Sequence, residues 1–478
     1  MRWKCIGCGY VEEGDPLLPR CPRCGSPLFI DLELGRDEVA KALEIAKQCR
    51  DAGVCGWSKL VGIECRVSLG EGWTPLLKVE SLSKALGVRV WVKNECLNPT
   101  HTFIDRGAAV DVSRAMSKGF RSLFVGGLGD FSVSMASYAK YAGLDVEVVM
   151  PRETDIQHLI RVVLSGARAS LVDSYESAVS TALRAGGRYP TLPSSGSVAQ
   201  GFKTIAYEVY AQLGRMPRAI LVPAGDGVLT SAIYAGFKDL SDALGLEPPR
   251  IIAVQHGFSP AIVEALGGRV VRDREDRSLR EVSIEQPQAL TAAIEAIRRS
   301  GGGAISVSSS EAISATVAIA KSLGVFIDPV GAVALAGVPR ALENGLIDPG
   351  EEVVVILSGC PSKDSFLLYR VAMSDRGISR VVRELIGADE EVNSSQLDIL
   401  AALAEEGPLN LCSLWRALRR RGRRISLSTI HHHLKVLMSM GLIEALPVEG
   451  TSRQLYAVTD KGLSVLKRYA PSAQLEDT

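Results

Sequence analysis

Four cysteines near the start of the chain have the spacing of metal ligands. Cys5 and Cys8 form one Cys-x2-Cys pair, and after twelve further residues Cys21 and Cys24 form a second pair. A glycine directly after each pair lets the backbone fold back, so that both thiolates can face one ion. Four thiolates leave no coordination position open, so the pattern predicts a structural zinc site. Four unrelated buried cysteines are the alternative interpretation.

A second stretch, residues 91–107, has the features of an anion-binding corner. A β-rich run at 88–92 leads into the turn Asn98-Pro99-Thr100. Asp105 then begins an apolar helical pattern, with the acid in the first turn, where the helix dipole favours it. A strand, a tight turn and a helix N-terminus together present backbone N–H groups to an anion.

Two further segments read as a strand, a glycine-rich turn and a helix. The first contains Gly126-Gly-Leu-Gly-Asp130, and the second contains Gly225-Asp226-Gly227 after an apolar run. Such a turn can hold a phosphate or dinucleotide at the helix N-terminus. It can equally serve only to join and pack a strand against a helix, and both interpretations stay open.

The stretch from Trp91 to Gly107 resembles the core motif of threonine synthase, a pyridoxal-phosphate enzyme of the tryptophan synthase β fold type. That family reads roughly K-[DN]-E-G-L-N-P-T-G-S-F-K-D-R-G, and this chain reads K-N-E-C-L-N-P-T-H-T-F-I-D-R-G at 93–107. Ile104 stands at the lysine that carries the family's cofactor as a Schiff base. Isoleucine has no amine and cannot form that bond. We therefore expect no catalytic residue, and no covalent link to any pyridoxal phosphate that binds.

The resemblance covers residues 1 to about 370, and the motifs of the scaffold are kept in G-E-G-W-T-P-L-L at 70–77, Q-G-F-K-T-I-A-Y-E at 200–208 and V-V-V-I-L-S-G at 353–359. It implies an α/β fold, with a two-lobed parallel-sheet body of PLP fold type II at 67–385. A zinc ribbon at 1–34 and a linker helix at 35–66 would precede this body.

The motifs that face the ligand in the family are altered in this chain. Asp130 falls at an asparagine that contacts the cofactor's ring hydroxyl, and Ser358 would meet the pyridine nitrogen. Asp226 puts a carboxylate where the cofactor's phosphate would sit, and Val228 replaces a glycine that allows close backbone approach. The expected pocket residues are Thr102, Phe103, Asp130, Gly225, Asp226, Gly227 and Ser358.

Length and composition set the class of protein. The 478 residues suit roughly two to four domains. Basic and acidic residues number 54 each, so any affinity for nucleic acid must come from a local surface. The lack of a long apolar run or a signal-peptide pattern predicts a soluble cytoplasmic protein without a membrane partner. There the ten cysteines are expected as metal ligands or thiols rather than disulfides.

The C-terminal part differs in charge, since residues 394–470 hold eleven Lys or Arg and six Asp or Glu. Periodicity and capping predict an order of helices and strands in this part. That order, with Gly441-Leu-Ile and the ending Arg453-Gln-Leu-Tyr-Ala-Val-Thr-Asp-Lys-Gly462, resembles winged-helix regulators of the PadR and ArsR type, which implies a winged helix at 390–472. The expected helices are 394–404, 413–420, one from a Ser426 or Ser428 cap to about 441, and one after 459; the expected strands are 442–445 and 454–458.

The third of these helices is the candidate recognition helix. At 100° per residue, Leu427, Ile430, Leu434 and Leu437 share the face toward the core. The opposite face carries Ser428, His432, Lys435 and Ser439, which are types that read bases in the major groove. An ordinary solvated face is the alternative. Three consecutive histidines, 431–433, point about 100° apart and cannot converge on one metal ion.

An arginine run lies before this helix, with five arginines in six positions. It suits phosphate contacts, with a solvated loop as the alternative. The predicted DNA-binding residues are Arg419, Arg420, Arg421, Arg423, Arg424, Ser428, Thr429, His432, Lys435 and Arg453.

These features predict a transcriptional regulator that binds double-stranded DNA as a homodimer. Its body would be a catalytically degenerate sensor for an amino acid or related metabolite. Fold does not fix function, so two alternatives stay open. One is a pyridoxal-phosphate-dependent lyase or ammonia-lyase with atypical chemistry, and the other is a scaffold that binds no small molecule.

Overall fold

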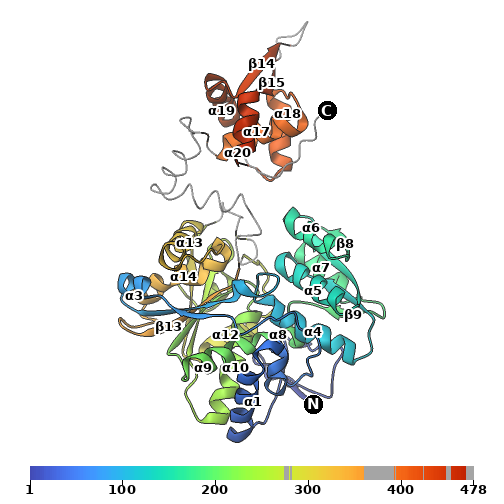
Figure 1. Ribbon diagram of the computed structural model, residues 1–478, viewed down its shortest axis with the longest axis vertical. Coiled ribbons are helices and arrows are strands. Elements are labelled where there is room, and N and C mark those ends of the chain that lie inside the picture. Colours follow the sequence, from blue (N-terminus) through green and yellow to red (C-terminus); the bar gives the residue numbers. More distant parts are fainter. Residues whose placement is uncertain are drawn as a thin grey trace. The chain divides into compact units, whose positions relative to one another are not determined.

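The computed structural model describes residues 1–273, 279, 283–359, 392, 394–423, 425–447 and 454–469. The chain divides into two compact units, Met1–Val371 and Ala372–Thr478 (Figure 1). The boundary predicted between residues 385 and 390 lies outside the described residues. Within the described residues, no helix is long and apolar enough to cross a membrane.

The first unit begins with a small antiparallel sheet that carries the four cysteines. Its central strand β1 (Arg2–Lys4) pairs with β2 (Val11–Glu13) and β3 (Phe29–Ile30). The predicted linker follows as α1 (Arg36–Gln48), a 3-10 segment (Arg50–Trp57) and the short α2 (Ser58–Val61).

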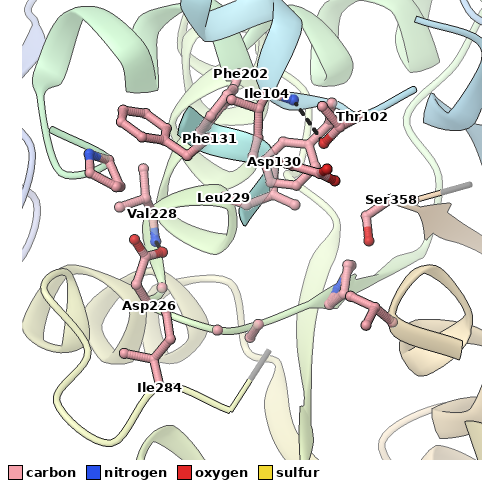
Figure 2. Close-up of a pocket in the computed structure, with 18 of the residues that line it drawn as sticks. Thr102, Ile104, Asp130, Phe131, Phe202, Asp226, Val228, Leu229, Ile284 and Ser358 are labelled. Atoms are coloured by element: carbon pink, nitrogen blue, oxygen red, sulfur yellow. Dashed lines mark hydrogen bonds between the residues drawn. The ribbon is translucent and has the colours of Figure 1, made fainter. Parts of the chain in front are cut away.

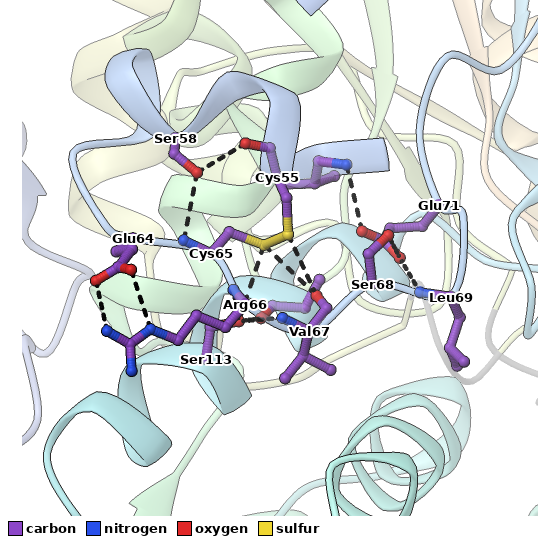
Figure 3. Close-up of a disulfide and its surroundings, with 12 residues drawn as sticks. Cys55, Ser58, Glu64, Cys65, Arg66, Val67, Ser68, Leu69, Glu71 and Ser113 are labelled. Carbon is purple, nitrogen blue, oxygen red and sulfur yellow. Dashed lines mark hydrogen bonds and ion pairs between the residues drawn. A yellow bond between two sulfur atoms is a disulfide. The ribbon is translucent and has the colours of Figure 1, made fainter. Parts of the chain in front are cut away.

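A disulfide between Cys55 and Cys65 closes the end of this linker, so the expectation of thiols was wrong for this pair (Figure 3). The Ser58 hydroxyl supports the loop, since it accepts a hydrogen bond from the Cys65 N–H at 3.3 Å and donates to the Cys55 carbonyl at 2.7 Å. The Ser113 hydroxyl accepts from the N–H groups of residues 66 and 67 at 2.9 and 3.0 Å. The loop is thereby fixed to the body.

Two sheets form the body and confirm the predicted α/β class. The larger has the order β12-β11-β10-β13-β5-β4 and the smaller has the order β8-β7-β6-β9. All pairs are parallel except β4 with β5. The strands are β4 (Leu76–Lys78), β5 (Arg89–Asn94), β6 (Ser122–Gly126), β7 (Asp145–Pro151), β8 (Arg168–Val172), β9 (Tyr189–Thr191), β10 (Ala219–Pro223), β11 (Arg250–His256), β12 (Gly303–Val307) and β13 (Glu352–Leu357).

Helices cover both faces of the larger sheet, which explains its unbroken apolar strands. In β10, Ile220 and Val222 face one core, whereas Ala219 and Leu221 face the other. The helices are α3 (Glu80–Leu86), the 3-10 turn η2 (Glu95–Leu97), α4 (Ile104–Ser117), α5 (Gly129–Tyr141), α6 (Ile156–Leu164), α7 (Tyr175–Ala182), α8 (Gly196–Phe202), α9 (Thr204–Leu213), α10 (Val228–Leu244), α11 (Ala261–Ala265), α12 (Leu290–Arg299), α13 (Ser309–Leu323) and α14 (Pro329–Glu343).

A buried ion cluster joins β5, η2, α4 and α9. Arg106 donates from Nε to Glu95 at 2.6 Å and from Nη1 to Glu208 at 2.6 Å. Lys93 donates from Nζ to the other Glu208 oxygen and to the Thr74 carbonyl, each at 2.7 Å. The ionic side chains are fully buried, so the charges must neutralise one another to be tolerated there.

The second unit has the order of elements predicted for a winged helix. Its third helix, α19, begins directly after Ser426, whose hydroxyl accepts a hydrogen bond from the Thr429 N–H at 3.1 Å. The first of the two predicted caps is therefore the one used. The elements are α17 (Ser394–Glu406), α18 (Leu411–Arg420), α19 (Leu427–Ser439), the antiparallel pair β14 (Ile443–Pro447) and β15 (Gln454–Val458), and α20 (Asp460–Tyr469).

Candidate functional site

The body has a pocket of about 110 Å³ at the carboxyl ends of its parallel strands, which is where open α/β sheets bind ligands. Thr102, Phe103, Ile104, Asp130, Gly225, Asp226, Gly227 and Ser358 all line it. The structure thus brings together every position that the sequence analysis assigned to the pocket. Figure 2 shows Ile104 with Thr102 and Asp130 on one side, Asp226 with Ile284 on another, and Ser358 beside them.

Four strand ends position these residues, since Asp130 follows β6 on the first turn of α5. The turn after β5 leads through Thr102 into α4, which begins at Ile104. The turn after β10 leads into α10. In this turn Gly227 has a φ of 86°, and a Cβ at this position would lie only 2.8 Å from the Ala293 Cβ. Only glycine suits that turn. Ser358 follows β13 directly and is buried.

The predicted anion-binding corner at the start of α4 is filled by the chain itself. The Asp105 carboxylate accepts hydrogen bonds from the Thr100 N–H at 2.6 Å and from the Thr100 hydroxyl at 2.5 Å. The Ser134 hydroxyl donates to the same carboxylate. The Asp105 carboxylate therefore holds the turn together and takes the Thr100 N–H for itself.

Asp130 lies on the first turn of α5, close to one imidazole and one guanidinium group. His158 Nε2 is 3.3 Å from the Asp130 carboxylate, and Arg161 Nη1 is 3.9 Å from it. Arg161 Nη2 also donates to the Thr100 carbonyl at 3.1 Å. The charge of Asp130 is thus balanced on the protein side of the pocket.

Asp226 has a different environment, in the loop before α10. One carboxylate oxygen accepts a hydrogen bond from the Val228 N–H at 3.0 Å. Burial raises the pKa of Asp226 to about 6, against an ordinary value of 3.8, and the Val228 bond only partly opposes this shift. The ionised form is therefore the costly one in this loop.

We predict that Asp226→Asn stabilises the body near neutral pH. Because the folded-state pKa of Asp226 is raised, the unfolded chain ionises it more easily, and stability falls as pH rises from about 4 to about 6. Asparagine removes this cost, so the free energy of unfolding should rise by about 1–2 kcal/mol at pH 8 and stay unchanged at pH 4. Urea denaturation at both pH values measures this; Asp242→Asn, on the exposed side of α10, is the control and should bring no gain.

Sequence reasoning missed several residues that complete the pocket. Tyr175 comes from α7, which packs on the smaller sheet. Thr230 comes from the first turn of α10, and Ile284 from the segment before α12. None belongs to a recognisable motif. Phe131 directly follows the recognised turn at 126–130, and Phe202 lies within the kept motif at 200–208. Both also line the pocket and could have been inferred from their position.

The four cysteines of the N-terminal sheet form a cluster that could hold a metal ion. The Sγ atoms of Cys5, Cys8, Cys21 and Cys24 all lie within 4.8 Å of one another. The distance from Cys5 to Cys24 is 3.5 Å, and that from Cys8 to Cys21 is 3.4 Å. Thiolates at about 2.3 Å from a zinc ion would be about 3.8 Å apart in a tetrahedron, so the cluster has the dimensions of a closed four-thiolate site.

We expect one zinc ion per chain at this cluster. Cys21→Ala should reduce the zinc content to well under one per chain, because three thiolates cannot close the site and metal binding supplies folding energy to such a ribbon. Metal analysis of the purified protein measures this. Cys49→Ala, at an exposed free thiol, is the matched control and should keep one zinc; an unchanged content in Cys21→Ala would contradict the assignment.

The candidate recognition helix α19 has one buried and one exposed face. Ile430, Leu434 and Leu437 are fully buried, as predicted. Leu427 is 42% exposed, so its assignment to the core was wrong; it is the first residue of the helix, where the core has not yet begun. The face predicted to read bases, with Ser428, His432, Lys435 and Ser439, is exposed, and so is Thr429, the other DNA-binding residue predicted on this helix.

The arginine run is partly engaged within its own unit. Arg419 lies over the Trp415 ring, 4.8 Å from its centroid. Three of the others reach back to acidic side chains of α17. The pairs of Arg420 and Arg421 are exposed and contribute little to stability, so phosphates can replace their carboxylate partners. Arg424 and Arg453 lie outside the described residues. The ion pairs are Arg420–Glu406 and Arg421–Glu405, each at 2.7 Å, and Arg423–Asp398 at 2.8 Å.

Comparison with known proteins gives independent matches to both units. Residues 67–359 match the family described as pyridoxal-phosphate dependent enzyme, and residues 393–445 match the bacterial regulatory protein family of the arsR type. The chain is 31% identical to threonine synthase of Methanocaldococcus jannaschii over 382 residues, which cover 76% of this chain and 93% of that one. It is 34% identical to threonine synthase of a Bacillus species over 304 residues, 62% of this chain and 85% of that one.

Solved structures agree on the fold of the body. The processed form of threonine deaminase isoform 2 from Solanum lycopersicum has a TM-score of 0.53 at 21% identity, covering 75% of this chain and 99% of that chain. A pyridoxal 5′-phosphate-dependent aspartate racemase has a TM-score of 0.54 at 17% identity, covering 70% and 97%. At these identities the likeness establishes the fold alone.

Proposed function

Because this chain belongs to the pyridoxal-phosphate-dependent enzymes, and within them to the threonine synthase family, we propose that it is a transcriptional regulator whose enzyme-derived body senses a small molecule. The observation that carries the proposal is the pairing, in one chain, of an ArsR-type DNA-binding fold with a pocket whose lysine position holds Ile104. A winged helix has no part in amino-acid chemistry. A retained pocket without its nucleophile still offers a binding site.

The pocket's residues do not fit pyridoxal phosphate as the family holds it. Ile104 offers no amine for a Schiff base. Asp226 places a carboxylate in the loop where a phosphate would need N–H donors, and one of those donors, the Val228 N–H, is taken by Asp226 itself. No lysine lines the pocket within the described part of the chain. Two lysines within the family motifs are buried elsewhere in the body. Lys93 forms an ion pair with Glu208, and Lys203 forms one with Asp239.

We therefore expect that pyridoxal phosphate forms no covalent adduct with the wild-type protein. After incubation and borohydride reduction, mass spectrometry should find no pyridoxyl group on a specific lysine. Ile104→Lys should not restore threonine synthase activity, because Asp130 and Asp226 remain. A single stoichiometrically modified lysine in the wild-type protein would instead support the alternative of an enzyme with atypical chemistry.

The DNA-binding part of the proposal rests on α19 and its surroundings. A recognition helix needs an apolar face toward its own core and a hydrogen-bonding face toward the major groove, and α19 has both. Its N-terminal turn carries Ser428 and Thr429, which are small enough for close approach to the bases. The preceding arginines add sequence-independent attraction to phosphates. One winged helix reads one half-site, so we propose a homodimer on two half-sites.

Selection from a random duplex library tests the proposal directly. The full-length, zinc-loaded protein should enrich a motif with two half-sites about one helical turn apart. If no motif is enriched, the regulator proposal fails, and the winged helix is better explained as a protein-interaction module.

A further inference from the structure

Two buried hydroxyl groups in the pocket have no hydrogen-bond partner within the described residues. They are Tyr175 Oη and Thr230 Oγ1. Tyr175 is 8% exposed and Thr230 is fully buried. A buried hydroxyl without a partner costs free energy comparable to a lost hydrogen bond, and such groups in folded proteins are rare. Both hydroxyls can therefore bond to a polar group that enters the pocket.

The charge next to these hydroxyls is negative. Asp226 lines the same pocket. Burial is the main cause that raises the pKa of the Tyr175 hydroxyl, and the nearby charge of Asp226 raises it further. The tyrosine therefore stays protonated. Among the described residues that line the pocket there is no lysine and no arginine. Arg20, the cation that acts on Tyr175, lies outside the pocket lining and donates to Ser194 at 3.1 Å and to Gln288 at 2.9 Å.

The remaining walls are mainly apolar. Phe103 and Phe202 meet edge to face, with ring centroids 4.9 Å apart, and both line the pocket together with Phe131, Leu229 and Ile284. Figure 2 shows the Asp226 carboxylate between Val228 and Ile284, with one oxygen turned to the Val228 N–H. Of the two carboxylates that line the pocket, Asp130 has Arg161 beside it at 3.9 Å. The Asp226 carboxylate in otherwise apolar walls favours a ligand that is apolar along its length and cationic at one end.

Resting on the sensor function proposed above, we propose that the pocket binds a phosphate-free ammonium compound. Its ammonium group would pair with Asp226, and the hydroxyls of Tyr175 and Thr230 would supply further hydrogen-bond acceptors. Its apolar part would lie against the phenylalanine rings and Ile104. Phosphorylated ligands would be excluded, because their charge would meet Asp226 with no lining cation to offset it. The substitutions at Ile104 and Asp226 then have one meaning: they convert a phosphate and Schiff-base site into an amine site.

A set of isosteric probes tests the sign of the charge. Benzylamine, benzyl alcohol and benzoate share one ring and differ in the charge of the attached group. Calorimetric titration of the full-length, zinc-loaded protein should give benzylamine at least about tenfold tighter binding than benzyl alcohol, since a charge-assisted bond is roughly twice as strong as a neutral one. Benzoate and pyridoxal phosphate should not bind measurably. Equal binding of the amine and the alcohol, or tighter binding of either anion, would overturn the proposal.

Two variants link the preference to the named residues. Asp226→Asn should abolish the advantage of benzylamine over benzyl alcohol, and because it is expected to fold with higher stability, a loss of binding cannot be ascribed to unfolding. Thr230→Val removes an unpartnered hydroxyl and should weaken benzylamine several-fold. Asp242→Asn should change nothing. An unaltered amine preference in Asp226→Asn would refute the assignment.

The outcome is independent of DNA binding. Amine binding without an enriched DNA motif would leave the ligand class standing and remove the regulator function. An enriched DNA motif together with no preference for the amine would support the regulator function and remove the proposed ligand class.

Discussion

Lys435→Ala is expected to weaken binding to the selected duplex by about 1–3 kcal/mol, or roughly five- to 150-fold, while binding to mixed-sequence DNA changes little. The reason is the position of Lys435 on the exposed face of α19, opposite the buried Leu434 and Leu437. A side chain that reads a base edge contributes only when the correct base is present. Fluorescence anisotropy with the selected and a scrambled duplex, at one fixed salt concentration, measures the difference.

Two comparisons make this result specific. Lys47→Ala removes the same charge from an exposed position of α1 and should leave both affinities unchanged. Arg419→Ala should weaken both duplexes alike and reduce the slope of affinity against salt by about one counterion, as expected for a phosphate contact. If Lys435→Ala instead behaves like Arg419→Ala, the residue contacts backbone phosphate, and base reading must be sought elsewhere on the helix.

Features that depend on local sequence were predictable. The spacing of the four cysteines requires one knuckle at each pair, and the structure brings all four thiols together. The Ser426 cap and the apolar spacing of α19 fix that helix almost to its ends, because capping and periodicity act within one or two turns. Leu427 departed from the pattern only because it precedes the first buried turn.

Features that depend on long-range packing were not predictable from the residues alone. Cys55 and Cys65 have no diagnostic spacing, and their bond depends on the fold of the whole linker over Ser113. Tyr175 enters the pocket from the smaller sheet, and Thr230 is an ordinary helix residue until its neighbours are known. The resemblance located the pocket through its altered motifs, but only three-dimensional structure could reveal hydroxyls without partners.

Glu208→Gln is expected to cause the largest loss of stability, about 3–5 kcal/mol at neutral pH, because it leaves Lys93 and part of Arg106 buried without their counter-charge. Burial alone would raise the pKa of Glu208, but Arg106 and Lys93 outweigh it and hold the pKa well below its ordinary value. The carboxylate is therefore ionised in the folded protein. Glutamine keeps the shape and one acceptor oxygen, so the loss reports charge rather than packing. Chemical denaturation of the body, followed by tryptophan fluorescence, measures it.

Glu64→Gln is the matched control, since Glu64 pairs with Arg66 at 2.8 Å on the exposed surface. Its loss of stability should be far smaller than that of Glu208→Gln, because solvent screens an exposed pair. The pH dependence gives a second test. Burial lowers the pKa of Lys93, and Glu208 opposes this, so in Glu208→Gln the pKa of Lys93 should fall further. The unfolded chain then binds more protons than the folded one, and the variant's stability should recover as pH rises toward the ordinary pKa of lysine. If Glu208→Gln lost no more stability than Glu64→Gln, and its loss did not change with pH, water would have to screen the buried ion cluster in solution.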